Sequence, residues 1–167
     1  MNSEHPFTLV HQPADLPTHA QINHSAPHLD SLYAVGFSID ADWVETAYRR
    51  GLFPWYNAGE PVLWHSPEPR MVLALDDFKI SHSLHKRLKQ WARQPELGYR
   101  VTLNRVFERV ISACSETPRV GQGGTWIHTA LKNAYIELHH RQRAVSVEVW
   151  QHDQLIAGLY GVLIGKM

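Results

Sequence analysis

The chain has 167 residues, 44% of them hydrophobic, which is enough for one ordinary domain, or one small and one partial domain, with a packed core. Its 16 Lys and Arg balance its 16 Asp and Glu, so any basic surface must be local. The single Cys114 excludes an internal disulfide, no apolar run approaches the roughly 20 residues that span a bilayer, and the N-terminus lacks a signal-peptide pattern. We expect a cytoplasmic protein with no membrane partner.

The first 30 residues hold five histidines and four prolines with little periodicity, which predicts an irregular, partly ordered lead-in. A helix follows from Ser38, where Ser38 or Asp40 can cap the first turn. Gly51 supplies the left-handed stop. One stripe of this helix is apolar and is expected to face a core: Trp43, Val44, Ala47 and Tyr48.

The stretch GLFPWYNAGEPVLWHSPEPR, residues 51–70, crowds aromatic side chains among prolines. Pro54 removes an amide donor and fixes φ, so the aromatics must lie on a rigid, non-helical platform. Such a platform either fills a gap between domains or offers a flat apolar face to a ligand ring. We predict a short strand at 62–64, a turn at SPEPR and a buried strand at 71–75. The resulting domains are 1–68 and 69–167.

Residues 81–93 read as a second helix with Leu84, Leu88 and Trp91 facing inward. Its outward face carries four cations and no acid, together with His82 and His85. A charged helix face is usually just solvated, yet in a chain of zero net charge this face indicates a local basic ridge suited to phosphates. The four cations are Lys86, Arg87, Lys89 and Arg93.

The remaining pattern predicts a strand at 99–103, a helix at 105–114 capped by Asn104, a helix at 129–141, and strands at 144–150 and 155–164. This β-α-α-β-β order, with the last two strands as a hairpin, gives an α+β fold class. The final strand is almost continuously apolar and needs neighbours on both edges. We therefore expect a C-terminally incomplete version of a larger fold.

Four ordered motifs carry a family resemblance: AYRRGLFPW at 47–55, LWHSPEPR at 63–70, GTWI at 124–127, and SVEVW followed by GLYGV at 146–162. From about residue 30 to its end, the chain resembles leucyl/phenylalanyl-tRNA–protein transferases. The resemblance implies a small N-terminal α/β domain followed by an acetyltransferase-like (GNAT-type) domain, whose first part would be residues 69–167. The acetyltransferase pyrophosphate loop is not seen in the sequence, so neither coenzyme A nor any other cofactor is expected.

The resemblance also implies site residues. Trp55 and Trp126 would flank the 3′-terminal adenosine of an aminoacyl-tRNA, and the basic helix would contact tRNA phosphates. Core packing is the usual explanation for a single tryptophan, but the pair in two motifs favours base stacking. Leu159 would line the pocket for the aminoacyl side chain. Gly124, Thr125 and Ile127 would support the second loop, whereas Trp43, Trp64, Trp91 and Trp150 are expected to be structural.

The implied reaction moves leucine or phenylalanine from its tRNA to a protein that begins with Arg or Lys, which marks that protein for N-terminal-residue-dependent degradation. The family segments Phe-x-Gly-Glu-Ser and Asp-Cys-Gln, which organise the amine, would lie beyond Met167. We assign no catalytic residue and no metal site, give Glu148 a structural role, and expect weak or no transfer by residues 1–167 alone. The alternatives are a non-catalytic binder of aminoacyl-tRNA 3′ ends and a small-molecule N-acetyltransferase.

Overall fold

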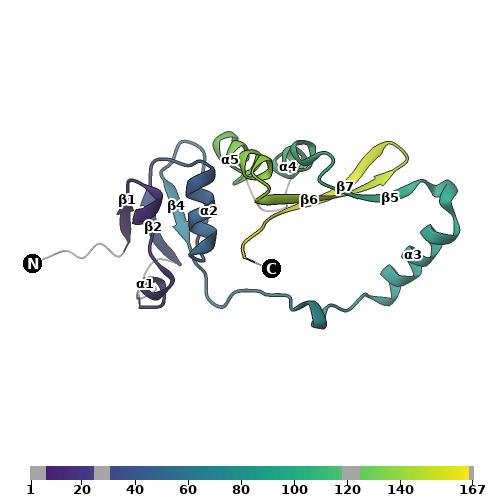
Figure 1. Ribbon diagram of the computed structural model, residues 1–167, viewed down its shortest axis with the longest axis horizontal. Coiled ribbons are helices and arrows are strands. Elements are labelled where there is room, and N and C mark those ends of the chain that lie inside the picture. Colours follow the sequence, from purple (N-terminus) through teal and green to yellow (C-terminus); the bar gives the residue numbers. More distant parts are fainter. Residues whose placement is uncertain (1–6, 25–30, 118–124, 166–167) are drawn as a thin grey trace, which may run out of the picture.

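The computed structural model describes residues 7–24, 31–117 and 125–165, which form an α+β protein with two sheets and five α-helices (Figure 1). The N-terminal sheet has the strand order β1-β2-β4-β3, and the second sheet has the order β5-β6-β7. The first half of the chain supplies β1 (Thr8–Val10), α1 (His19–His24), β2 (Leu32–Gly36), α2 (Ala41–Arg49), β3 (Phe53–Pro54) and β4 (Val62–His65).

Helix α2 confirms the predicted start and stop signals. The Asp40 side chain accepts hydrogen bonds from the amides of Asp42 and Trp43, so two of the first-turn donors are satisfied. At the other end, Gly51 has φ +80°. The amide of Leu52 donates to the Ala47 carbonyl at 2.8 Å, which closes a Schellman motif. This turn delivers the chain directly into β3.

Helix α2 packs on the N-terminal sheet, and the two share one hydrophobic core. Trp43 on α2 stacks on Trp64 of β4 with ring centroids 5.8 Å apart, and both indoles are buried, as expected for structural tryptophans. The prediction of an irregular lead-in is wrong for residues 7–24. There β1 pairs in parallel with β2, and three side chains enter the core: Val10, Leu16 and Ile22. Apolar residues can be too widely spaced to show periodicity and still fix a segment in place, because pairing with a sheet edge brings their side chains to the core.

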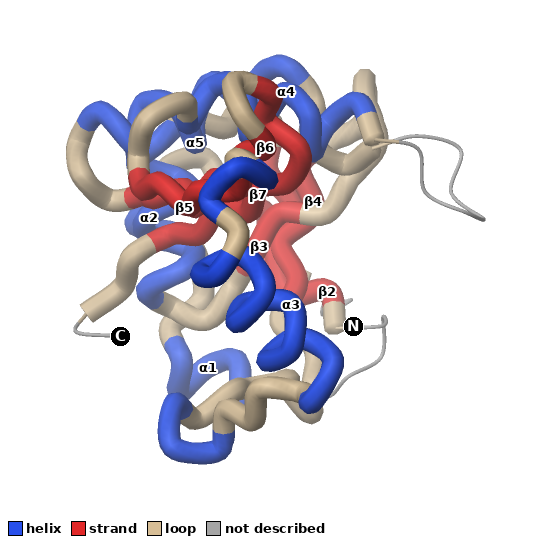
Figure 2. Tube along the Cα trace, turned by 90° about the vertical axis from the view of Figure 1, so that its right-hand side faces the viewer, coloured by secondary structure: helices blue, strands red, loops and turns tan. Residues whose placement is uncertain are grey.

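The second half confirms the β-α-α-β-β order, with β5 (Tyr99–Leu103), α4 (Phe107–Glu116), α5 (Thr129–His140), β6 (Ala144–Gln151) and β7 (Gln154–Val162). All strand pairs are antiparallel, and β6 and β7 form the predicted hairpin. Both views place α4 and α5 on the same side of this sheet (Figures 1 and 2). The stripe predicted for residues 129–141 is buried there: Leu131, Ala134, Tyr135 and Leu138.

Asn104 does not cap α4, so that prediction is wrong. Asn104 has φ +56° and its side-chain oxygen accepts from the Ser146 amide, 2.9 Å away. The fully buried Glu148 carboxylate takes the capping place, because it accepts from the amides of Arg105 and Val106 at the helix start. It also accepts from the Ser146 and Thr102 hydroxyls. Glu148 therefore has the structural role expected of it.

The segment between the two sheets differs most from the predictions. Residues 71–75 do not form a buried strand: Met71 is 98% exposed, and a short 3₁₀ turn, η2 (Leu75–Asp77), follows. Helix α3 (His82–Arg93) confirms the helix predicted over residues 81–93 and is capped by Ser81, yet Leu84 and Leu88 are 41% and 40% exposed. Neither apolar run meets a sheet edge or core within the described residues, so periodicity alone does not bury them.

None of the described helices is long and apolar enough to cross a membrane. A last 3₁₀ turn, η3 (Pro95–Leu97), joins α3 to β5. Trp91 of α3 stacks on Tyr99 of β5 with centroids 4.3 Å apart, which ties the C-terminal end of this helix to the sheet. Figure 1 shows α3 at the opposite end of the molecule from the N-terminal sheet.

Candidate functional site

The FPW segment is an edge strand with one exposed indole. Pro54 is buried and pairs with Trp64 across β3 and β4, and the Trp55 amide donates to the Leu63 carbonyl at 2.9 Å. The Trp55 side chain itself is 56% exposed and lies edge-on to His65, with ring centroids 5.9 Å apart. The backbone of Trp55 is thus fixed by the sheet while its ring is available for contact.

The GTWI segment enters helix α5. Ile127 is buried, and its amide donates to the Thr125 hydroxyl at 3.1 Å. Trp126 is partly buried and packs against the core formed by α2, α4 and α5. Gly124, the third residue predicted to support this loop, lies outside the described residues.

One contact joins these two segments directly. His128 Nε2 lies 2.9 Å from the carbonyl oxygen of Tyr56, and the two rings meet edge to face with centroids 5.5 Å apart. Because a carbonyl oxygen only accepts, Nε2 carries the proton and donates. Tyr56 follows Trp55 in the chain, and His128 is two residues after Trp126. The structure therefore brings together the segments that carry the two predicted stacking residues.

A second set of contacts holds the same two parts together through helices α2 and α5. The hydroxyls of Tyr48 and Tyr135 are 2.8 Å apart, and Arg141 forms an ion pair with Asp42. Burial raises the pKa of Tyr48, and it raises that of Tyr135 well above its usual range. Burial thus disfavours ionisation of both hydroxyls, which share one hydrogen bond.

Sequence reasoning assigned no role to His128 or to the tyrosine hydroxyl pair. The available signal was weak: His128 directly follows GTWI, and Tyr48 stands in the AYRRGLFPW motif. Arg70, the last residue of LWHSPEPR, was also quoted only as part of a motif. Its guanidinium nitrogen lies 3.6 Å from where a Cβ on Gly51 would be, so it sits beside the turn that leads into β3. None of these contacts follows from sequence spacing.

Leu159 lies on the face of the second sheet that α4 and α5 leave uncovered. It pairs with Val147, which in turn pairs with Leu103, so the three side chains share one face. Leu159 is 59% exposed and Leu103 is 66% exposed. The adjacent Gly158 faces the other way, where a Cβ would meet Val110 of α4 at 3.0 Å. Leu159, Val147 and Leu103 thus form an apolar surface on this face of the sheet.

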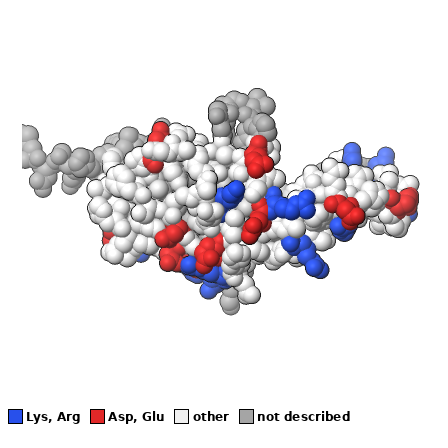
Figure 3. All heavy atoms as spheres, turned by 90° about the horizontal axis from the view of Figure 1, so that it is seen from above, with Lys and Arg blue, Asp and Glu red and all other residues white. Residues whose placement is uncertain are grey.

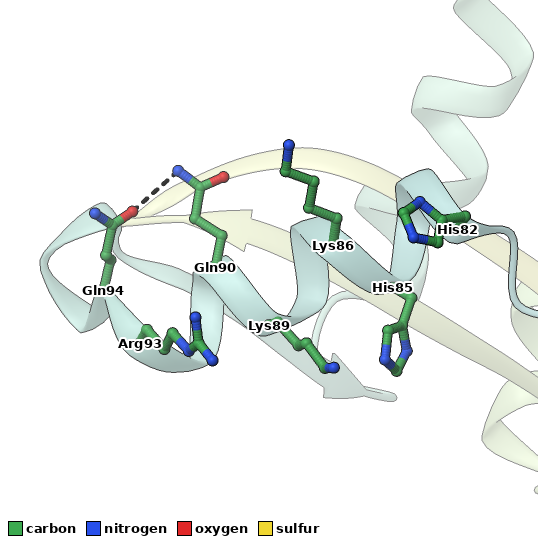
Figure 4. A pocket seen from close by; sticks show the side chains of 7 residues that line it. All are labelled: His82, His85, Lys86, Lys89, Gln90, Arg93 and Gln94. Carbon is green, nitrogen blue, oxygen red and sulfur yellow. Dashed lines mark hydrogen bonds between the residues drawn. The ribbon is translucent and has the colours of Figure 1, made fainter.

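Helix α3 carries a shallow cationic surface with a cavity volume of about 680 Å³ (Figure 4). Two rows of side chains line it, as the close-up shows, with Gln90 hydrogen-bonded to Gln94 at 3.0 Å. Three of the four predicted cations take part, whereas Arg87 is not among the lining residues. The lining residues are His82, His85, Lys86, Lys89, Gln90, Arg93 and Gln94.

The charge of α3 is local. On the face seen from above, Lys and Arg are interspersed with Asp and Glu, and no large area has a single sign (Figure 3). Helix α3 itself has no acidic residue along its 12 positions. The structure does not bring this helix next to β3 and the loop before α5, since it lies at the far end of the molecule (Figure 1).

Comparison with known proteins assigns the chain to one family. Residues 72–167 match the family described as leucyl/phenylalanyl-tRNA protein transferase, and residues 37–68 match the N-terminal domain of the same transferase. The Trp126 and Leu159 segments fall in the first match, and the Trp55 segment falls in the second. Both halves of the candidate site thus lie within regions that the family shares.

Curated relatives agree. The leucyl/phenylalanyl-tRNA–protein transferase of Methylibium petroleiphilum is 47% identical over 136 residues, covering 81% of this chain and 51% of that protein. That of Flavobacterium johnsoniae is 44% identical over 138 residues, covering 83% and 62%. That of Hydrogenovibrio crunogenus is 40% identical over 163 residues, covering 97% and 60%. The chain, which spans about half to three fifths of the length of these relatives, belongs to the leucyl/phenylalanyl-tRNA–protein transferase family.

Proposed function

We propose that the protein containing this chain binds the 3′ end of an aminoacyl-tRNA and transfers its leucine or phenylalanine to the N-terminal Arg or Lys of an acceptor protein. The product would be marked for N-terminal-residue-dependent degradation. Family membership supports the class of reaction. We place the activity in the cytoplasm, where charged tRNA is made, and propose no cofactor.

The observation that carries this proposal is the contact between Tyr56 and His128, which places the Trp55 and Trp126 segments side by side. Trp55 adds an exposed indole on a backbone held by strand pairing. An indole held at a fixed angle can stack on a base, and such a stack is worth about 1–3 kcal/mol. A terminal adenosine offers one flat face to each indole, so it is the ligand that we propose for this pair.

The aminoacyl side chain is proposed to lie against the uncovered sheet face at Leu159. Val147 and Leu103 extend that apolar surface across β6 and β5. A leucine or phenylalanine side chain gains from such a surface, whereas a charged one would lose its hydration there. Discrimination between apolar side chains would be modest, at about 1–3 kcal/mol per methylene, so some use of methionine is expected.

The cationic surface of α3 is proposed to contact tRNA phosphates through Lys86, Arg87, Lys89 and Arg93. Lys86, Lys89 and Arg93 line the same hollow of this cationic surface, which supports this role. Contacts to phosphates position a nucleic acid without reading its sequence. Because α3 lies far from Trp55, it would hold a part of the tRNA remote from the terminal adenosine.

For the architecture, we propose the domains 1–68 and 69–167, the latter as the first part of an acetyltransferase-like (GNAT-type) fold. The β5-α4-α5-β6-β7 order with an antiparallel sheet supports this arrangement. The chemistry would be aminolysis of an activated ester, which needs a neutral amine, a proton acceptor and stabilisation of an oxyanion. We assign none of these roles to a residue of this chain.

The test measures two quantities on one preparation: binding of Leu-tRNA, and transfer of labelled leucine from it to an Arg-initiated peptide. Trp55→Ala should weaken binding by about five- to 150-fold, the equivalent of one lost stack. Phe78→Ala is the matched control, because Phe78 is an aromatic side chain with the same 56% exposure as Trp55 and has no proposed contact with the tRNA. Binding without transfer would favour the non-catalytic binder instead, and binding insensitive to Trp55→Ala would contradict the proposed site.

A further inference from the structure

We infer that His128 is a positioning residue that sets the spacing between the Trp55 and Trp126 indoles. The inference rests on the proposed function, since it concerns the same site. Trp55 directly follows β3 of the N-terminal sheet, and Trp126 lies in the loop before α5. Their spacing is therefore a tertiary property, which some contact between the two parts must fix.

The hydrogen bond from His128 to the Tyr56 carbonyl is well placed for this task. It acts on the residue adjacent to Trp55 and comes from a residue two positions after Trp126. The hydroxyl pair of Tyr48 and Tyr135 also joins the two parts, but it is seven residues from Trp55 and nine from Trp126. Helices α2 and α5 therefore hold the two parts together, whereas the His128 hydrogen bond acts close to the two residues that carry the indoles.

The ring of His128 adds a second constraint. It meets the Tyr56 ring edge to face at 5.5 Å, with an interplanar angle of 69°. Together, the hydrogen bond and the ring contact restrain the separation of the two segments as well as their relative rotation. The neighbouring backbone is also held, because the Ile127 amide donates to Thr125 and the Trp55 amide donates to Leu63.

Spacing matters because stacking attraction falls steeply with distance. Two indoles that flank a base must hold their faces about 7–8 Å apart, which is twice the optimal carbon–carbon separation. A gap of 0.5–1 Å beyond that optimum forfeits roughly a quarter to a half of the attraction. Loss of the His128 contact should therefore weaken base binding even though His128 need not touch the base.

The test uses four variants, two at His128, Trp126→Ala and its double variant with His128→Phe, and a short ribo-oligonucleotide ending in CCA whose affinity is measured by fluorescence anisotropy. His128→Phe keeps a ring and removes the donor, so the affinity should fall about two- to tenfold. His128→Gln keeps an N–H donor and should recover most of the affinity. In a Trp126→Ala background, His128→Phe should have little further effect, because only one indole remains to be positioned.

His139→Phe is the matched control. His139 Nδ1 lies 2.9 Å from the Ala144 carbonyl oxygen, and its ring stacks on Phe107, so the control also loses one histidine–carbonyl hydrogen bond and keeps a ring. It should lower the urea midpoint about as much as His128→Phe does while leaving oligonucleotide affinity unchanged. Equal affinity losses in both variants would reduce His128 to a merely structural residue.

The outcomes also separate this inference from the proposed function. If Trp55→Ala and Trp126→Ala weaken oligonucleotide binding but His128→Phe does not, the positioning role is wrong and the stacking site stands. If neither tryptophan variant changes the affinity, the proposed stacking site itself fails. A His128→Phe effect that persists unchanged in the Trp126→Ala background would also overturn the positioning role.

Discussion

Helices α3 and α5 have 12 residues each and similar apolar spacing, yet their surroundings are opposite. In α5, Leu131 and Leu138 are fully buried between α2, α4 and the second sheet. In α3, Leu84 and Leu88 remain about two-fifths exposed, and the whole helix buries no residue. Periodicity defines which face of a helix is apolar, but a neighbouring element decides whether that face is buried.

The largest expected change in stability distinguishes the apolar stripe of α5 from that of α3. Leu138→Ala leaves a cavity in a closed core and should lower the free energy of unfolding by about 2–5 kcal/mol. Leu88→Ala removes a partly exposed side chain and should cost less than about 1 kcal/mol. Urea unfolding followed by circular dichroism measures both. A Leu88→Ala loss as large as that of Leu138→Ala would show that α3 is packed in solution.

Glu148→Gln tests the buried carboxylate that caps α4 from a neighbouring strand. The amide would place an N–H₂ group against donors that now share the carboxylate, so unfolding should become easier by about 1–3 kcal/mol. Glu137→Gln is the control, because its ion pair with Arg141 is solvent-exposed and should be worth at most about 1 kcal/mol.

The same site predicts an acid dependence. Burial raises the pKa of Glu148, but its hydrogen bonds outweigh burial, and the net pKa lies below the usual value. A carboxyl with a depressed folded pKa stabilises the fold above its unfolded pKa of about 4.3 and loses that stabilisation as the pH falls through the folded value. Glu148→Gln should flatten this acid limb in unfolding curves measured from pH 6 to pH 2. An unchanged limb would exclude Glu148 as its source.

The hydroxyl pair between α2 and α5 should have an intermediate effect. Tyr48→Phe and Tyr135→Phe should each cost about 1 kcal/mol, and the double variant should cost less than the sum, because both singles break the same bond. Additive losses in this double-mutant cycle would mean that the hydroxyls do not interact.

Alkaline pH gives the pair a second signature. Burial holds the Tyr135 pKa well above its usual value, so the unfolded chain loses this proton near pH 10 while the folded protein retains it. Stability should therefore fall as the pH rises above about 10, and Tyr135→Phe should make that decline shallower. Unfolding midpoints between pH 8 and pH 11 measure this difference.

The smallest effect on stability is expected at the cationic surface of α3. Lys86→Gln combined with Lys89→Gln should change the free energy of unfolding by no more than about 0.5 kcal/mol. When the logarithm of the tRNA association constant is plotted against the logarithm of the salt concentration, the same double substitution should make the slope shallower by about 0.7–0.9 for each phosphate contact removed. Arg87→Gln, at a residue that does not line the hollow, is the comparison. If Arg87→Gln reduced the salt dependence equally, the tRNA would respond to the overall positive charge of α3 and not to the lining residues in particular.

Local signals in the sequence predicted much of the fold. The cap of α2 and the left-handed Gly51 follow from interactions within a few residues, and the β6–β7 hairpin follows from alternating apolar residues on either side of a short turn. The site was predictable only as two motifs and a basic helix. The donor at His128 and the cap at Glu148 were missed, because each acts on a residue more than 40 positions away.

The sequence alone was sufficient to predict the family, two candidate stacking residues, and most helix and strand boundaries. These depend on residue type and short-range spacing, which the printed chain contains in full. The folded structure was needed to show that the Trp55 and Trp126 segments meet, that α5 is buried while α3 is exposed, and that Glu148 takes the place predicted for Asn104 at the start of α4. Long-range contacts depend on which surfaces the folded chain brings together, and no local pattern specifies that choice.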